Sequence, residues 1–226
     1  MQGRRYNWCM KRREFGQYCG LARALELVGE RWALLIVRDL TVRPRRYTDL
    51  LEGLPGIPTN VLSTRLKELE HSGIVERRVA PAPQRGVLYA LTPVGQELEP
   101  AIHTLGRWGA TQLGDPRPGE IVTPESVTAN FRGAFNADAA TGVTASWEIH
   151  ARDLVLHLVV TDGKLESGPD PAVDKPDLTI TAQLADDELS SYRAIMQAAK
   201  CGLVELNGRR RLLDTFVRLF DRPRAA

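Results

Sequence analysis

The sequence predicts a multi-domain protein with two domains, a mostly α N-terminal domain containing a β-hairpin and a C-terminal α+β domain. Three observations support this fold class. Apolar residues recur at helical spacing up to about residue 113, and they alternate as in strands from residue 144. The stretch GDPRPGE between these regions is rich in Pro and Gly, as linkers are. We therefore expect domains at 1–113 and 121–226, joined by a linker at 114–120.

The two halves differ in charge, the third observation, although the chain of 226 residues has a formal net charge of only +2. Residues 1–118 carry 18 Lys and Arg against 12 Asp and Glu, and residues 119–226 carry 12 against 16. A basic half favours a polyanionic partner such as nucleic acid. Three cysteines without a CxxC pair, and no apolar run of about 18 residues, predict a cytoplasmic protein with no membrane span.

The first helices are predicted from apolar positions three and four residues apart. This spacing covers residues 19–28 and 31–40, with Gly29 as the break between them. A short third helix over 45–54 is ended by Gly53 and the proline that follows it.

A fourth helix is buried on one side only. Leu62, Leu66 and Leu69 form its apolar stripe, and short polar side chains occupy the opposite side of its first turns. Short hydroxyl and amide groups let a helix approach base edges, and the B-DNA major groove, about 12 Å wide, admits a helix. The candidate contact residues at this stage are Thr59, Asn60, Ser63, Thr64 and Lys67.

Two strands follow, over 73–80 and 86–91, and Arg85 stands at the tip of the turn between them. Helix, turn, helix and basic hairpin is the order of a winged helix-turn-helix. In that arrangement the second helix of the motif enters the major groove, and the hairpin reaches along the backbone or into the minor groove.

The runs CGLARALELVGERWALLIVRDL, RRYTDLLEGLPGI, VLSTRLKELEHSGIVERR and LYALTPVGQELEPAIHTLGRWG resemble the HxlR-type regulators, a branch of the MarR-like winged-helix group, over residues 15–113. The resemblance implies a dimer that binds operator DNA near promoters. Arg65 lies to one side of the leucine stripe, where it could instead pair with a carboxylate. By resemblance, Ser63, Thr64, Arg65 and Lys67 would face DNA, and Arg77, Arg78 and Arg85 would serve the wing.

Two positions need separate comment. The family usually has Ser-Pro before this helix, whereas this chain has Pro58 and Thr59, so we expect the helix cap to come from Thr59 or Asn60. Some family members use the cysteine at the position of Cys19 to sense oxidants or electrophiles, and Arg23 one turn later could favour its thiolate. A helical cysteine is also commonly an inert small hydrophobe, so both readings remain open.

A further helix is predicted over 93–113, with apolar residues available for burial. By resemblance it joins the N-terminal segment in the dimer interface. A two-fold dimer predicts an inverted-repeat operator in double-stranded DNA, with half-sites about 34 Å apart or a multiple of that distance.

The second half reads as α+β. We expect a helix at 124–137, strands at 144–151, 153–160 and 176–183, a turn at 161–164 and a helix at 185–199. A short strand and a last helix, RRRLLDTFVRLF, complete it. From residue 176 onward the order resembles the closing segment of the sterol-carrier-protein (type 2) fold, and the match covers about residues 122–221.

That resemblance implies a pocket for a small apolar effector. Taken singly, each candidate lining residue is more typical of ordinary core than of a pocket. The candidates are Phe131, Phe135, Trp147, Leu156, Ile180, Tyr192, Met196 and Phe216.

Enzyme chemistry finds little support. The chain has no GxSxG, GxGxxG or P-loop motif, and His150 and His157 lack partners at metal-ligand spacing. We expect no catalytic residues, no metal and no cofactor. The prediction is a homodimeric, sequence-specific DNA-binding transcription regulator, a repressor, modulated by a small hydrophobic effector. The alternative is a lipid or hydrophobic-ligand carrier that uses its winged helix for dimerisation or protein contacts.

Overall fold

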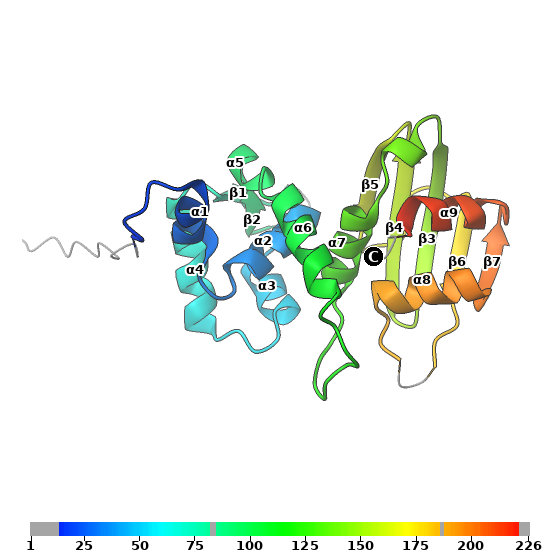
Figure 1. The fold of residues 1–226 in the computed structure, drawn as a ribbon, viewed down its shortest axis with the longest axis horizontal. Coiled ribbons are helices and arrows are strands. Elements are labelled where there is room, and N and C mark those ends of the chain that lie inside the picture. The colour runs from blue at the N-terminus through cyan, green and yellow to red at the C-terminus, as the bar shows by residue number, and fades with distance from the viewer. Residues whose placement is uncertain (1–13, 82–84, 186–187, 222–226) are drawn as a thin grey trace, which may run out of the picture.

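The computed structural model describes residues 14–81, 85–185 and 188–221 (Figure 1). Its N-terminal part has six helices and a two-stranded sheet within these residues. Their bounds are α1 Gly20–Val28, α2 Ala33–Val42, α3 Tyr47–Gly53, α4 Thr59–His71, β1 Val75–Val79, β2 Val87–Leu91, α5 Pro93–Gln96 and α6 Glu99–Ala110. The sequence of helix, turn, helix and hairpin is that of a winged helix, as predicted.

The core of this part is built on the predicted stripe of α4. Leu62, Leu66 and Leu69 are almost completely buried and pack with apolar residues of α2 and α3, among them Ile36 and Leu50. Burying leucines of this kind contributes about 1.5–3 kcal/mol each. One face of α4 is therefore committed to the core, and its other face is left to solvent.

The wing is an antiparallel hairpin extended by one residue. Strands β1 and β2 pair from Val75 opposite Leu91 to Val79 opposite Val87. Arg45, just before α3, adds an isolated bridge to Tyr89 of β2 through two backbone hydrogen bonds of 2.9 and 2.7 Å. The entry to α3 is thus fastened to the base of the wing.

The predicted single helix over 93–113 is wrong in one respect, because it is two helices, α5 and α6. The break at Glu97 and Leu98 follows Gly95, which lies so close to β1 that a Cβ added to it would stand 2.2 Å from the carbonyl oxygen of Ile74. Residue 95 must therefore be glycine in this packing. Three apolar residues of the α6 region that were expected to be available for burial are exposed in the monomer: Leu105, Trp108 and Leu113.

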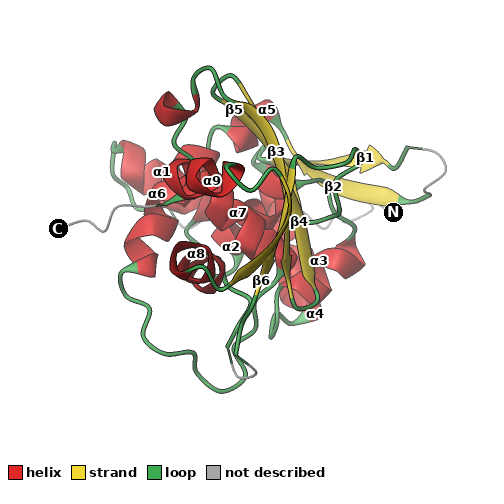
Figure 2. Cartoon of the chain, turned by 90° about the vertical axis from the view of Figure 1, so that its right-hand side faces the viewer, coloured by secondary structure: helices red, strands yellow, loops and turns green. Residues whose placement is uncertain are grey.

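The C-terminal part is a five-stranded mixed sheet with helices on one face, as Figure 2 shows. The strand order is β5-β4-β3-β6-β7; neighbours pair antiparallel except β3 and β6, which are parallel. The bounds are α7 Pro124–Ala134, η1 Asp138–Ala140, β3 Thr144–Ala151, β4 Leu154–Thr161, β5 Lys164–Gly168, β6 Leu178–Ala182, α8 Tyr192–Cys201, β7 Val204–Gly208 and α9 Leu212–Phe220.

Two elements differ from the sequence prediction. Strand β5 was not predicted, because Lys, Glu, Ser and Gly are weak strand formers and its pairing with β4 supplies what they lack. Helix α8 begins at Tyr192 rather than near residue 185, with Ser191 as its N-cap: the Ser191 hydroxyl oxygen accepts a hydrogen bond of 3.2 Å from the Ala194 amide. Residues 186–187, within the predicted helix, lie outside the described residues.

Helix α7 joins the two parts. It packs against α2 and α6 of the winged helix and also against β4, β5, α8 and α9 (Figure 1). The segment between α6 and α7, residues 111–123, contains the predicted linker at 114–120. In the described part of the chain, no helix has the length and apolar character needed to cross a membrane.

Candidate nucleic-acid interface

Helix α4 lies in the end of the molecule that is remote from the five-stranded sheet (Figure 1). Thr59, Asn60 and Lys67 are exposed, and Lys67 makes no ion pair with any described residue. Thirteen residues make a helix about 20 Å long, and its outer side carries no bulky apolar group in the first two turns. Short polar side chains at the start of the helix can reach base edges, and the Lys67 ammonium farther along it can contact a phosphate of the DNA backbone.

The start of α4 lacks the side-chain cap predicted from Thr59 or Asn60. Pro58 is the N-cap residue, and no side chain accepts a hydrogen bond there. The first amides of the helix therefore remain available to an anion such as a DNA phosphate.

A tyrosine of α3 supports this end of the helix. The Tyr47 hydroxyl group donates a hydrogen bond of 2.7 Å to the carbonyl oxygen of Thr59 and lies 3.0 Å from Ser63 Oγ. The Ser63 hydroxyl is thus already engaged within the protein. The Thr64 hydroxyl likewise donates to the carbonyl oxygen of Asn60 at 2.8 Å, so it can offer a base its methyl group and the two acceptor lone pairs of its oxygen, but no proton.

Arg65 is held inside the protein rather than facing outward. Its guanidinium group pairs with Glu30 at 3.0 Å and also with Glu68, and its side chain is only 18% exposed. Glu30 lies between α1 and α2, so Arg65 fastens α4 to that turn. The structure therefore favours the carboxylate-pairing role for Arg65 over the predicted DNA contact.

The wing arginines differ in how far they are engaged. Arg77 pairs with Glu70 at 2.9 Å and Arg78 pairs with Glu76 at 2.6 Å, both on the surface. The Arg85 carbonyl oxygen accepts a hydrogen bond of 2.6 Å from Arg46, and the Arg85 side chain stays exposed. Surface pairs of this kind contribute at most about 1 kcal/mol, so phosphate groups can compete for Arg77 and Arg78.

Cys19 is exposed and stands at the N-cap of α1. The backbone N–H groups of Ala22 and Leu21 lower the pKa of its thiol, and the small effect of burial opposes them. Arg23, which was expected to favour the thiolate, pairs with Glu26 at 2.7 Å instead. Helix amides rather than a neighbouring cation therefore stabilise the thiolate.

The predicted effector-lining residues lie in the core of the C-terminal part. Phe131 is surrounded by the rings of Tyr192, Phe216 and Phe220, with centroids 4.9–5.9 Å away. Trp147 lies 6.2 Å from Phe216, and its indole nitrogen donates to the carbonyl oxygen of Leu212. These rings pack directly against one another. Residues placed in or against this core are Phe131, Phe135, Trp147, Leu156, Ile180, Tyr192, Met196 and Phe216.

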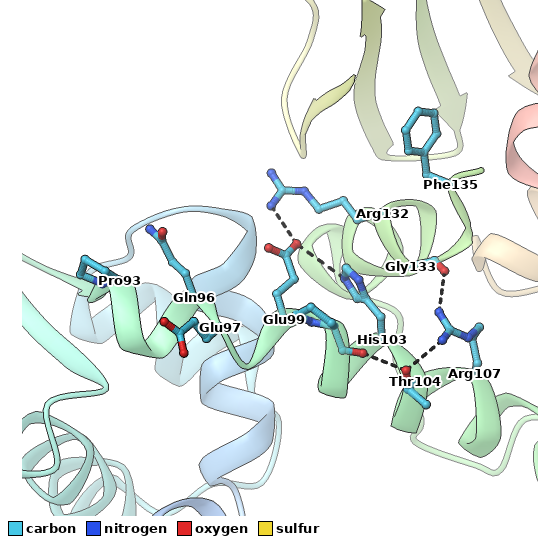
Figure 3. Close-up of a pocket in the computed structure, with 11 residues that line it drawn as sticks. Pro93, Gln96, Glu97, Glu99, His103, Thr104, Arg107, Arg132, Gly133 and Phe135 are labelled. Carbon is cyan, nitrogen blue, oxygen red and sulfur yellow. Dashed lines mark hydrogen bonds and ion pairs between the residues drawn. The ribbon is translucent and has the colours of Figure 1, made fainter. Parts of the chain in front are cut away.

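An open groove of about 620 Å³ lies instead where the two parts meet, between α5 and α6 on one side and α7 on the other (Figure 3). Glu99 stands at its centre, 3.7 Å from both His103 and Arg132. Arg107 donates to the carbonyl oxygen of Gly133 at 3.3 Å. Of the predicted lining residues, Phe135 borders this groove.

Sequence reasoning missed two residues that organise the interface, Arg46 and the hydroxyl of Tyr47. Both belong to the Arg-Arg-Tyr run at the start of α3. Each acts across the fold, on the wing at Arg85 and on α4 at Ser63, so local spacing held no signal for their contacts. Across the described ranges, no group of three or more His, Cys, Asp or Glu side chains could hold a metal ion.

Comparison with known proteins agrees with this geometry. The family model described as HxlR-like helix-turn-helix matches residues 27–116. The HTH-type transcriptional regulator YodB of Bacillus subtilis is 38% identical over 102 residues, 45% of this chain and 88% of the relative. The uncharacterized HTH-type transcriptional regulator sll1512 of Synechocystis sp. is 38% identical over 96 residues, 41% of this chain and 71% of the relative. The solved reduced form of YodB from B. subtilis covers 45% of this chain and 99% of that chain at 36% identity, with a TM-score of 0.37.

The family match spans α2 to α6 with the wing and leaves the five-stranded sheet outside it. The matched relatives are named as transcriptional regulators of the helix-turn-helix type. Through its winged helix, this chain belongs to the HxlR-like helix-turn-helix family of DNA-binding transcription regulators.

Proposed function

We propose that the protein is a homodimeric repressor that reads an inverted-repeat operator through α4. The observation that carries this proposal is the polar side of α4, where exposed Thr59 and Asn60 precede a Lys67 that pairs with no described carboxylate. In this reading Asn60 and Thr59 contact base edges, and Lys67 with the wing arginines contacts phosphates.

Dimerisation is supported by apolar side chains that the described monomer leaves exposed. On α1, Leu21 is 69% and Leu25 is 43% exposed; on α6, Leu105 is 49% and Trp108 is 64% exposed. Exposed apolar residues gathered on two helices are typical of an interface, and a two-fold dimer would bury both sets at once. Such a dimer places two copies of α4 on successive half-sites.

Repression would follow from position. A dimer with two recognition helices covers about two turns of duplex, and occupation of a site near a promoter excludes other proteins from it. The family's helix-turn-helix assignment favours this regulator over the alternative, a carrier of hydrophobic ligands in which the winged helix serves only protein contacts.

For the C-terminal part we propose a sterol-carrier-like domain that senses a small apolar effector. Its support is the element order from β6 to α9. A ligand there would change operator affinity only by binding the DNA-competent and incompetent arrangements unequally. We propose that the protein acts by binding alone and catalyses no reaction.

The test is selection of bound duplexes from a randomised DNA pool by the full-length protein at about physiological salt. The proposal expects enrichment of an inverted repeat whose half-site centres are one or more helical turns apart. Binding that is absent even at low salt would overturn it and favour the carrier. Binding without any sequence preference would overturn the operator reading, because phosphate contacts alone do not specify sequence.

A further inference from the structure

Helix α7 has two buried faces that serve different parts of the molecule. Val127 and Phe131 belong to the core of the C-terminal part. Glu125 and Arg132, seven residues apart, lie on the other face, and both contact the winged helix. The carboxylate of Glu125 is 4% exposed, which is unusual for a charged group unless it is paired.

Glu125 and Arg132, at the two ends of this second face, both contact the segment between α2 and α3. Glu125 Oε1 lies 2.8 Å from Arg45 Nη1 and 3.0 Å from Arg43 Nη2. Eleven angstroms or so along the helix, Arg132 donates from Nη1 to the carbonyl oxygen of Thr41 at 2.6 Å and from Nη2 to that of Val42 at 3.3 Å. The last carbonyls of α2 and the arginines that follow it are thus held from both ends of α7.

The segment between α2 and α3 is bonded directly to the wing, α3 and α4, the elements proposed to face DNA. Arg45 exchanges two backbone hydrogen bonds with Tyr89 of the wing, and its Nη2 donates to the carbonyl oxygen of Asp49 in α3 at 2.8 Å. Tyr47, two residues later, holds the start of α4. A displacement of Arg45 would therefore move the base of the wing and α3 together.

We propose that Glu125 and Arg132 are positioning residues for DNA recognition, contributed by the C-terminal part of the chain. They hold the turn at 41–46 so that α3, α4 and the wing are presented in one arrangement. The proposal rests on the DNA-reading function proposed above. Arg132 also borders the groove between α6 and α7, so a molecule bound in that groove would contact one of these two positioning residues.

Glu125 gives the clearer test of the two residues, because few other carboxylates compensate the charge of Arg45. Arg45 is 8% exposed, and the other carboxylate near it, Asp39, lies 4.0 Å away. Replacing Glu125 by Gln would leave a buried cation poorly compensated, and removal of one partner from a buried pair is costly. Asp170 offers a matched control, since it pairs with the same Arg43 at 2.8 Å but is 55% exposed.

The experiment compares Glu125→Gln with Asp170→Asn in the full-length protein, using a selected operator and hydrogen exchange at temperatures where both remain folded. We expect Glu125→Gln to weaken operator binding by about 5- to 20-fold per active molecule and to speed exchange at Arg45 and Tyr89. Exchange in β3 and β4 should stay unchanged. Asp170→Asn should stay within twofold, and Glu125→Asp should recover part of the loss because it keeps the charge.

Unchanged exchange at Arg45 and Tyr89 in Glu125→Gln, with wild-type operator affinity, would overturn the inference. A wild-type protein that binds no duplex would instead be a failure of the proposed function, and the exchange measurement would still decide whether α7 holds the wing. If Glu125→Gln does not fold, Arg132→Lys carries the same test, since one ammonium cannot reproduce the fork on Thr41 and Val42.

Discussion

The Tyr47 hydroxyl lies 3.0 Å from Ser63 Oγ and donates a hydrogen bond to the carbonyl oxygen of Thr59, so a side chain of α3 holds the first turn of α4. The N-cap residue there is a proline without a capping side chain. Tyr47 therefore fixes the first turn of α4 in place, as a serine or threonine N-cap commonly does, but through a carbonyl oxygen of the turn rather than through its amides.

Tyr47→Phe should weaken operator binding by about fivefold, because one hydrogen bond worth about 1 kcal/mol is lost while the ring packing stays. Titration of the operator by fluorescence anisotropy would measure this. Tyr89→Phe is the matched control, since the Tyr89 ring lies 5.9 Å from the Arg77 guanidinium and its hydroxyl makes no hydrogen bond with a described residue. Equal affinities for Tyr47→Phe and wild type would show that the first turn of α4 needs no such support.

Lys67→Ala should reduce affinity for all duplexes about equally. Because the Lys67 ammonium has no carboxylate partner among the described residues, its loss removes one phosphate contact and should lower the slope of log K against log salt by about 0.9. Lys164→Ala, at an exposed lysine of β5, should leave the slope unchanged. A slope unaffected by Lys67→Ala would place that lysine away from the phosphates.

Asn60→Ala should act differently from Lys67→Ala. Asn60 is exposed in the first turn of α4, and a bidentate amide contact to a base is worth about 1–3 kcal/mol of discrimination. We expect preference at one base pair of each half-site to relax while nonspecific binding is retained. Repeating the duplex selection with the variant would show this as loss of a single conserved position, and an unaltered motif would rule out a base contact by Asn60.

Trp108→Glu should convert the proposed dimer to monomers. Trp108 is 64% exposed on α6, and burial of a tryptophan at an interface centre commonly contributes 2 kcal/mol or more. Sedimentation velocity at micromolar concentration would resolve the two states. Val173→Glu, at a fully exposed valine in the loop before β6, is the control and should remain dimeric. A dimer that survives Trp108→Glu would move the interface away from α6.

The local patterns of the chain predicted most of the helices, but they predicted few of the contacts that join residues far apart in the sequence. The stripe of Leu62, Leu66 and Leu69 was predictable because burial and helical period coincide. Strand β5 was not, because its stability comes from pairing with β4 rather than from its own residues. The pairing of Arg43 with Glu125 joins residues 82 positions apart, and no spacing rule connects them. The site divides in the same way: exposure of Asn60 and Lys67 followed from the helical period, whereas the engagement of Arg65 depended on Glu30 in another turn.

Asp39 gives a prediction about pH. It is completely buried on α2, and burial raises the pKa of its carboxyl group above the ordinary value, although Arg38 and Arg45 oppose that shift. A raised pKa in the folded state means that the native protein binds this proton more tightly than the unfolded chain does. The contribution of Asp39 to stability is therefore fully present at low pH and is lost as the pH rises from about 4 through the raised value.

Asp39→Asn removes this titration, so the unfolding free energy of wild type minus that of Asp39→Asn should be largest at acidic pH and should fall as the pH rises through that window. Urea unfolding of both proteins between about pH 4 and pH 7 would measure the difference. Asp170→Asn is the matched comparison, because the Asp170 carboxylate pairs with Arg43 but is 55% exposed to solvent. A difference that grows with pH would mean that Arg38 and Arg45 outweigh burial and hold the Asp39 charge as a net stabiliser.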